Sequence, residues 1–146
     1  MQPVSSDTET ILELLNMILH FTQSREQVLI DNIRFLEKPG FIPKDLDAEA
    51  FSQIVDAALT EYMTHNRLVL RDTEDIQFLP EGAFNVTPAE DEDAARLRPH
   101  TERYYQYQAQ KLAQNATNAR VAQRLIEMGA SDRPWAAAQR VPRNVA

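Results

Sequence analysis

Residues 48–79, which read AEAFSQIVDAALTEYMTHNRLVLRDTEDIQFL, decide the expected fold. Their first half repeats apolar side chains at spacings of three and four residues, the period that lines one face of an α-helix. Asp45 or Asp47 stands just before this stripe and can cap the first turn. The pattern predicts an amphipathic helix over residues 48–65. Its apolar stripe consists of Phe51, Ile54, Val55, Ala58, Leu59, Tyr62 and Met63.

The second half of the same stretch predicts a β-hairpin. Residues 66–70 and 76–79 favour strands because they are rich in Leu, Val, Ile and Phe. Residues 71–75 are polar and form the connecting turn in this prediction. Pro80 lacks the amide hydrogen needed for a sheet ladder, so it ends the second strand.

Upstream of this stretch the sequence predicts two helices with a short link. Ser6 and Glu9 form a capping box, in which each side chain satisfies a free amide of the first turn. Ser24 and Gln27 repeat the arrangement and predict a second helix start. An apolar stripe follows each signal, and Pro39-Gly40 ends the second helix.

The order helix, helix, turn, helix and hairpin, over about residues 7–80, resembles a winged-helix module. The resemblance implies that the hairpin is the wing and that the preceding helix is the recognition helix. Some winged-helix subunits of chromosome-organising complexes bind protein rather than DNA, and residues 46–79 look like that arrangement. We use the resemblance as an analogy for the fold, not for the function.

Downstream of the hairpin three further helices are expected. Thr87 to Glu90 form a third capping box, which predicts a short helix that Pro99 ends. A long helix follows over about residues 100–128, with Gly129 as its C-terminal cap. A last short helix beginning at Ser131 or Asp132 contains Trp135, and the end of the chain is expected to fray.

These elements predict a mainly α-helical protein. A chain of 146 residues has room for one full domain. Residues 1–86 are expected to form an acidic, winged-helix-like domain of three helices and one β-hairpin. Residues 87–146 are expected to form a linker helix, the long basic helix and the frayed tail.

The long helix contains a seven-residue repeat with small side chains, which favours close packing against another helix. This packing partner is either the amino-terminal domain or a second copy in a coiled coil. The repeat consists of Tyr105, Ala109, Leu112, Ala116, Ala119 and Ile126.

Charge is segregated along the chain. Residues 1–95 contain 19 acidic and 6 basic side chains, a balance of −13. Residues 96–146 contain 3 acidic and 9 basic side chains, a balance of +6. Surfaces of opposite sign favour complementary association within the chain, between copies or with another molecule.

Composition argues against most catalytic chemistry and against a cofactor. The chain has no cysteine, and its three glycines are too far apart for a phosphate-binding loop. His20, His65 and His100 lack the spacing of a metal site, and no Gly-x-Ser-x-Gly motif exists. No apolar run reaches the length of a membrane helix, and Met1 does not lead into a secretory signal. We therefore expect a non-enzymatic, cytoplasmic protein with no metal, cofactor or membrane partner.

Electrostatics argues against DNA binding in the usual winged-helix manner. The expected recognition helix carries Glu49, Asp56 and Glu61 and contains no Lys or Arg over residues 48–65. A helix that enters the major groove needs basic side chains to lower the repulsion from phosphates.

The long basic helix is the expected partner-binding element. Tyr and Arg are enriched both at protein interfaces and at nucleic-acid interfaces. We expect a protein partner or self-association, with DNA or RNA binding through this helix as the alternative; an acidic phosphate mimic fits less well because of the basic tail. Trp135 either anchors the tail on the protein or contacts a partner. The candidate partner-binding residues are Arg103, Tyr104, Tyr105, Tyr107, Lys111, Arg120, Arg124 and Trp135.

Overall fold

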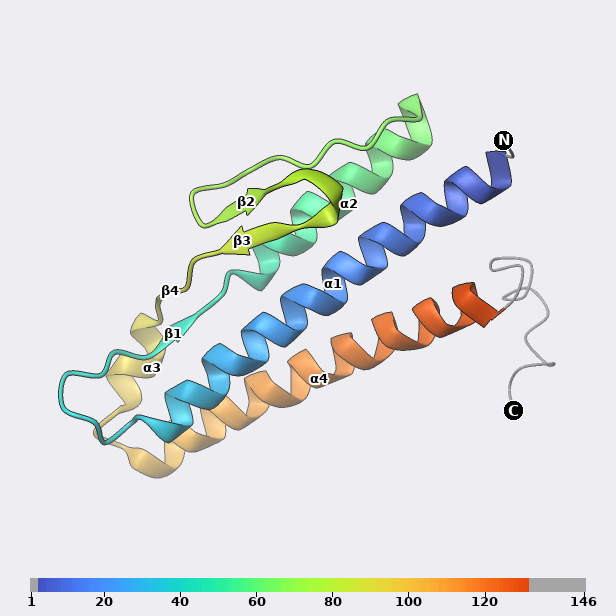
Figure 1. Cartoon of the computed structure of the whole chain (residues 1–146). Coiled ribbons are helices and arrows are strands. Elements are labelled where there is room, and N and C mark those ends of the chain that lie inside the picture. The colour runs from blue at the N-terminus through green and yellow to red at the C-terminus, as the bar shows by residue number, and fades with distance from the viewer. Residues whose placement is uncertain (1–2, 132–146) are drawn as a thin grey trace.

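The computed structural model describes residues 3–131, and three long helices dominate it (Figure 1). Helix α1 (Pro3–Arg34) lies in the middle, and α2 (Ala48–His65) and α4 (Thr101–Ser131) lie on either side of it. Both outer helices run antiparallel to α1, so they are parallel to each other (Figure 1). The mainly α-helical fold class is confirmed. None of the helices within residues 3–131 is long and apolar enough to cross a membrane.

Helix α1 is continuous, so the prediction of two amino-terminal helices with a break near Ser24 is wrong. The first residue after Ser24, Arg25, is buried and paired with Asp45 of the segment that follows α1. Leu29 and Asn32 are also buried, one and two turns further on. An unbroken helix keeps these three side chains on the packed face, and that gain outweighs the local capping signal.

Helix α2 confirms the helix predicted over residues 48–65. Asp47 is its N-cap and accepts a hydrogen bond of 2.9 Å from the Ala50 amide. Asn66 ends the helix in the left-handed conformation, with φ of 59°. Phe51, Ile54 and Ala58 of the predicted stripe are buried against α1 and the hairpin.

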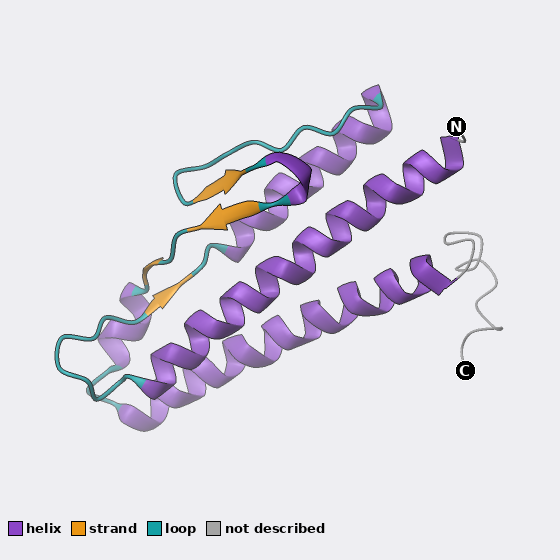
Figure 2. Ribbon diagram, in the orientation of Figure 1, coloured by secondary structure: helices purple, strands orange, loops and turns teal. Residues whose placement is uncertain are grey.

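A β-hairpin is present, but its strands are not the predicted pair. Strand β2 (Ile76–Phe78) pairs antiparallel with β3 (Phe84–Val86), and a 3-10 turn, η1 (Pro80–Gly82), connects them (Figure 2). Residues 66–70 form no strand. Ile76 of β2 and Phe84 of β3 are both buried in the core beside Phe51, and this burial favours the observed pairing.

The three-helix winged arrangement is therefore not confirmed, since only α1 and α2 precede the hairpin. The main core lies between α1, α2 and the hairpin. Its buried members are Leu14, Met17, Phe21, Leu46, Phe51, Ile54, Ala58, Ile76 and Phe84.

The third predicted capping box is also wrong. Residues Ala89–Glu90 form strand β4, which pairs antiparallel with β1 (Lys44–Asp45). Asp91 then caps the short helix α3 (Glu92–Leu97) by accepting a 3.1 Å hydrogen bond from the Ala94 amide. A helix that began at residue 88 would depend on the Thr87 side chain to cap its free amides. Pairing with β1 instead gives the backbone of residues 89–90 hydrogen-bond partners in a ladder.

Helix α4 extends three residues further than predicted, because it passes through Gly129 instead of ending before it. Gly129 is buried. The expected helix around Trp135 and the frayed end lie outside the described residues.

Candidate functional site

Helix α4 is fixed on α1 by a seam of polar side chains. Tyr104 is fully buried, and its hydroxyl donates a 2.8 Å hydrogen bond to the Asn32 carbonyl. About three turns further along α4, Asn115 donates a 2.8 Å hydrogen bond from Nδ2 to the Thr22 carbonyl. These bonds join positions 72 and 93 residues apart in the chain, so they fix the register of the two helices.

Asn32 is the centre of this seam. Its side chain binds both backbone groups of Lys44, with Nδ2 donating to the carbonyl at 2.7 Å and Oδ1 accepting from the amide at 3.0 Å. Nδ2 also donates to Oε1 of Gln108 at 3.1 Å. Nε2 of the buried Gln108 has no partner of hydrogen-bonding geometry among the described residues. A single amide thus connects α1, β1 and α4.

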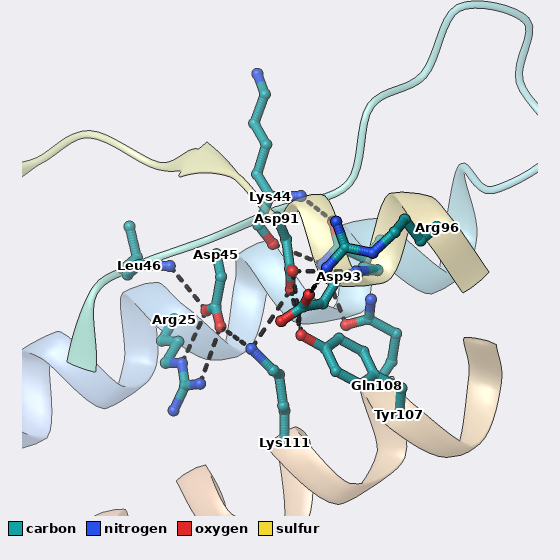
Figure 3. A network of polar contacts seen from close by, with 12 residues as sticks. Arg25, Lys44, Asp45, Leu46, Asp91, Asp93, Arg96, Tyr107, Gln108 and Lys111 are labelled. Carbon is teal, nitrogen blue, oxygen red and sulfur yellow. Dashed lines mark hydrogen bonds and ion pairs between the residues drawn. The ribbon is translucent and has the colours of Figure 1, made fainter. Parts of the chain in front are cut away.

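An ion network extends the seam toward α3 (Figure 3). The guanidinium of Arg25 binds both carboxylate oxygens of Asp45, at 2.8 and 3.0 Å. Nζ of Lys111 lies 2.7 Å from Asp45 and 3.4 Å from Asp91. The Tyr107 hydroxyl donates to Asp91 at 2.9 Å. The acidic half of the chain and its basic helix therefore neutralise each other here, inside one molecule.

The network shifts the acidity of its members. Burial alone would raise the pKa of Asp45, but hydrogen bonds from Arg25 and Lys111 outweigh it and leave that pKa below its ordinary value. Burial would lower the pKa of Lys111, but the bond to Asp45 leaves it raised. Burial raises the pKa of Tyr107, and it raises the pKa of Tyr104 to about 12. All four groups thus keep, at neutral pH, the protonation states that the network needs.

An acidic hollow lies beside this network. It has a volume of about 590 Å³, and Arg25 and Lys111 supply the positive charge at its inner wall. Within residues 3–131, no group of three or more His, Cys, Asp or Glu side chains is arranged to hold a metal ion. The acids around the hollow are Asp45, Asp47, Asp75, Glu90, Asp91, Glu92 and Asp93.

An apolar groove lies between α1, α2 and α4. The polar seam fixes α4 on one side of α1, and α2 lies on the other side. The groove has a volume of about 440 Å³. Phe21 is buried at its floor, while Val121 on the α4 wall is 55% exposed. The apolar side chains that line it are Leu15, Ile18, Phe21, Ala48, Phe51, Val55, Leu59, Val121, Ala122 and Leu125.

The sequence repeat does not predict the groove, because the predicted seven-residue repeat of α4 lies one residue beyond the side chains that pack on α1. The repeat through Tyr105 and Leu112 lies next to the true seam, which runs through Tyr104, Gln108 and Lys111. A one-residue step turns a helix by about 100°. Val121 and Leu125, four residues apart, were the available signal for the groove wall.

The candidate partner-binding residues divide into two sets. Tyr104, Tyr107 and Lys111 point into the fold and contact α1, β1 or the start of α3. Exposed side chains make up the second set, which comprises Arg103, Tyr105, Arg120 and Arg124. Trp135 lies outside the described residues.

Comparison of the chain with protein-family models, with curated proteins and with solved structures gives no match.

Proposed function

We propose that this protein is a non-enzymatic binding subunit whose apolar groove, between α1, α2 and α4, holds a protein partner. The observation that carries the proposal is the combination of this groove with Val121, a branched apolar side chain that is 55% exposed on its wall. A partner that covers Val121 and Leu125 removes apolar surface from water, which is the main driving force of protein association.

Charge supports a protein partner on both sides of the groove. Helix α2 carries Glu49, Asp56 and Glu61, and it has no Lys or Arg. Arg120 and Arg124 are exposed on α4. Such opposed rims orient an incoming protein and raise the rate of encounter more than they raise affinity.

The internal contacts narrow the proposed binding residues. Tyr104, Tyr107 and Lys111 are already engaged within the fold, so they position α4 and do not contact the partner in this proposal. Arg103, Tyr105, Arg120 and Arg124 remain available, and Tyr105 is 37% exposed. We place this role in the cytoplasm, and the winged-helix analogy has no part in it.

Binding of DNA or RNA through α4 is the second candidate function, and the exposed Arg103, Arg120 and Arg124 favour it. Its support is smaller, because the rings of Tyr104 and Tyr107 are packed against the fold and cannot stack on bases. Salt tests it directly. Two results together would support nucleic-acid binding. The affinity should fall by orders of magnitude between about 50 and about 200 mM salt, and it should be lost in the double variant Arg120→Ala with Arg124→Ala.

The test of the protein-binding function compares the wild-type chain with Val121→Glu in affinity purification from the cells that produce it. Val121 is exposed, so this change places a charge in the groove without removing a core contact. Val69 is half-buried and lines a separate small hollow, so Val69→Thr serves as the control for a change of valine outside the groove. A protein retained by the wild type and the control, and lost with Val121→Glu, supports the proposal. Identical retention by all three chains contradicts it.

A further inference from the structure

We propose that the occupant of the groove is a second copy of this chain, related by a two-fold axis that runs along the helices. This inference rests on the proposed function, because it assumes that the groove is a protein-binding surface. It specifies which helices meet across the interface and which charges pair.

The helices that form the two walls of the groove carry opposite net charge. Asp56 lines it on α2, a helix that contributes Glu49 and Glu61 as further negative charges and no basic residue other than His65. Val121 and Leu125 form the α4 wall, and both also border an adjoining hollow in which Arg120 and Arg124 lie. Two such faces that meet with α2 over α2 would bring negative charge against negative charge.

Symmetry offers one arrangement without that repulsion. A two-fold axis that lies between the two faces and runs along α1 exchanges the α2 side of the groove with the α4 side. It keeps each residue at the same height along the helix axes. It therefore places α2 of each copy over α4 of the other. The helices α2 and α4 are parallel (Figure 1). Asp56 lines the same groove as Val121 and Leu125, so in this arrangement Asp56 of one copy lies near the level of Arg120 and Arg124 of the other. The pairing occurs twice, once on each side of the axis.

The same arrangement covers exposed apolar surface on both helices. Val121 is 55% exposed, and Met63, which follows the groove residue Leu59 by four positions on α2, is 76% exposed. Both side chains are among the most exposed large apolar residues of residues 3–131. A second copy removes them from water while the acidic and basic rims remain outside the apolar strip, as in specific interfaces with an apolar centre and a polar rim.

The size of the face sets the expected strength. The lined part of α2, from Ala48 to Leu59, is about 16 Å long. Three helices spaced by about 8–10 Å give a face that is smaller than stable interfaces and in the range of weak, transient ones. We therefore expect a reversible dimer, with a dissociation constant in the range of about 1–100 µM.

Sedimentation velocity of the full chain, from about 1 to about 500 µM, tests the inference. The wild type should shift from monomer to dimer over this range. Asp56→Arg and Arg124→Asp should each weaken the dimer at least about tenfold, because each places like charges against one another twice. Asp56 and Arg124 are exposed, so both variants should keep the helical circular dichroism of the wild type.

A mixture of the two variants gives the decisive result. In a heterodimer of Asp56→Arg with Arg124→Asp, both cross-copy pairs are again of opposite sign, so the mixture should dimerise although neither variant does alone. Glu74→Arg and Arg71→Asp are the matched controls, because they make the same charge changes at exposed positions of the loop before β2. The controls should dimerise like the wild type.

Two results overturn the inference. A wild-type chain that stays monomeric at every concentration excludes the second copy, and a dimer whose variants do not recover on mixing excludes this symmetry. Neither result decides the proposed function, which fails only if Val121→Glu retains every protein that the wild type retains. An equal loss of dimer in Asp56→Arg and in Glu74→Arg also counts against the inference, since it would indicate a general charge effect.

Discussion

Nζ of Lys111 lies 2.7 Å from Oδ2 of Asp45, across 66 residues of sequence. Asp45 also binds Arg25, so one carboxylate from the acidic half of the chain holds a cation of α1 and a cation of α4. The bridge sets the position of α4 relative to α1. The groove depends on that position, since α4 provides one of its walls.

Replacing Asp45 by Ala should destabilise the fold by about 3 kcal/mol, because it leaves two poorly hydrated cations without their shared partner. Only 8% of the Arg25 side chain and 24% of the Lys111 side chain are exposed. Urea unfolding followed by circular dichroism measures the change. Asp93→Ala removes an exposed pair with Arg96 and should leave the midpoint close to that of the wild type, and an equal shift in both variants would contradict the role given to the network.

Acid should unfold the wild type partly through the same carboxyl. The pKa of folded Asp45 is lowered, so its contribution to stability is complete above about pH 4, the range of an unfolded Asp, and is lost as the pH falls through the folded value. Asp45→Asn should therefore have a lower stability at neutral pH and a flatter decline below about pH 4. Unfolding free energies measured at several pH values test this, and parallel curves for the two proteins would disprove it.

The sequence predicted α2 and the long α4 well, because their signals are local. Asp47 stands at the cap position, and Phe51 and Ile54 lie on one apolar face. The break near Ser24 was wrong for the opposite reason. Whether α1 ends there depends on Arg25 and its partner Asp45, 20 residues away, and no local pattern contains that pair.

The binding face was less predictable than the fold, since the face of α4 that packs on α1 is polar. Gln108, Lys111 and Asn115 have the composition of a solvated surface, whereas the small residues beside them suggested a seam. Their partners lie far away in the chain, among them Asn32, Asp45 and Thr22. The groove has walls from three helices, so it depends on how they pack. The local sequence indicates one wall only, through the four-residue spacing of Val121 and Leu125.

Asn32→Ala should lower the free energy of unfolding by about 2–4 kcal/mol, because it leaves the Lys44 amide and carbonyl without partners in a partly buried site. Amide hydrogen exchange gives a local readout. Exchange at Lys44 should accelerate far more than exchange within α2, for example at Ala58. Asn118→Ala, at an exposed position of α4, is the control, and unchanged protection at Lys44 would count against the Asn32 contact.

Gln108→Leu should change the stability of the protein by less than about 1 kcal/mol. The change removes a buried donor, Nε2, that has no hydrogen-bond partner among the described residues, but it also removes Oε1, which accepts a hydrogen bond from Nδ2 of Asn32. Gln108→Glu has nearly the same shape but places a charge at a fully buried position, so it should destabilise strongly. Thermal unfolding of both variants shows whether each change raises or lowers the stability of the fold. A loss of stability in Gln108→Leu similar to that in Gln108→Glu would show that the amide makes a contact worth more than its desolvation.

Alkaline pH should destabilise the fold through Tyr104. Its pKa is raised to about 12 by burial, whereas that of an unfolded Tyr is about 10. The stabilising effect of the neutral hydroxyl is complete below about pH 10 and is lost as the pH rises toward 12. Tyr104→Phe should start from a lower stability, because it leaves the Asn32 carbonyl without its 2.8 Å partner, but it should lose less stability between pH 10 and 12.

Lys111 and Tyr107 also have raised pKa values, so some alkaline loss of stability should persist in the variant. The ultraviolet absorbance of tyrosinate, recorded together with circular dichroism, separates ionisation of the tyrosines from unfolding. An identical alkaline decline in both proteins would show that Tyr104 ionises without disturbing the contact between α1 and α4.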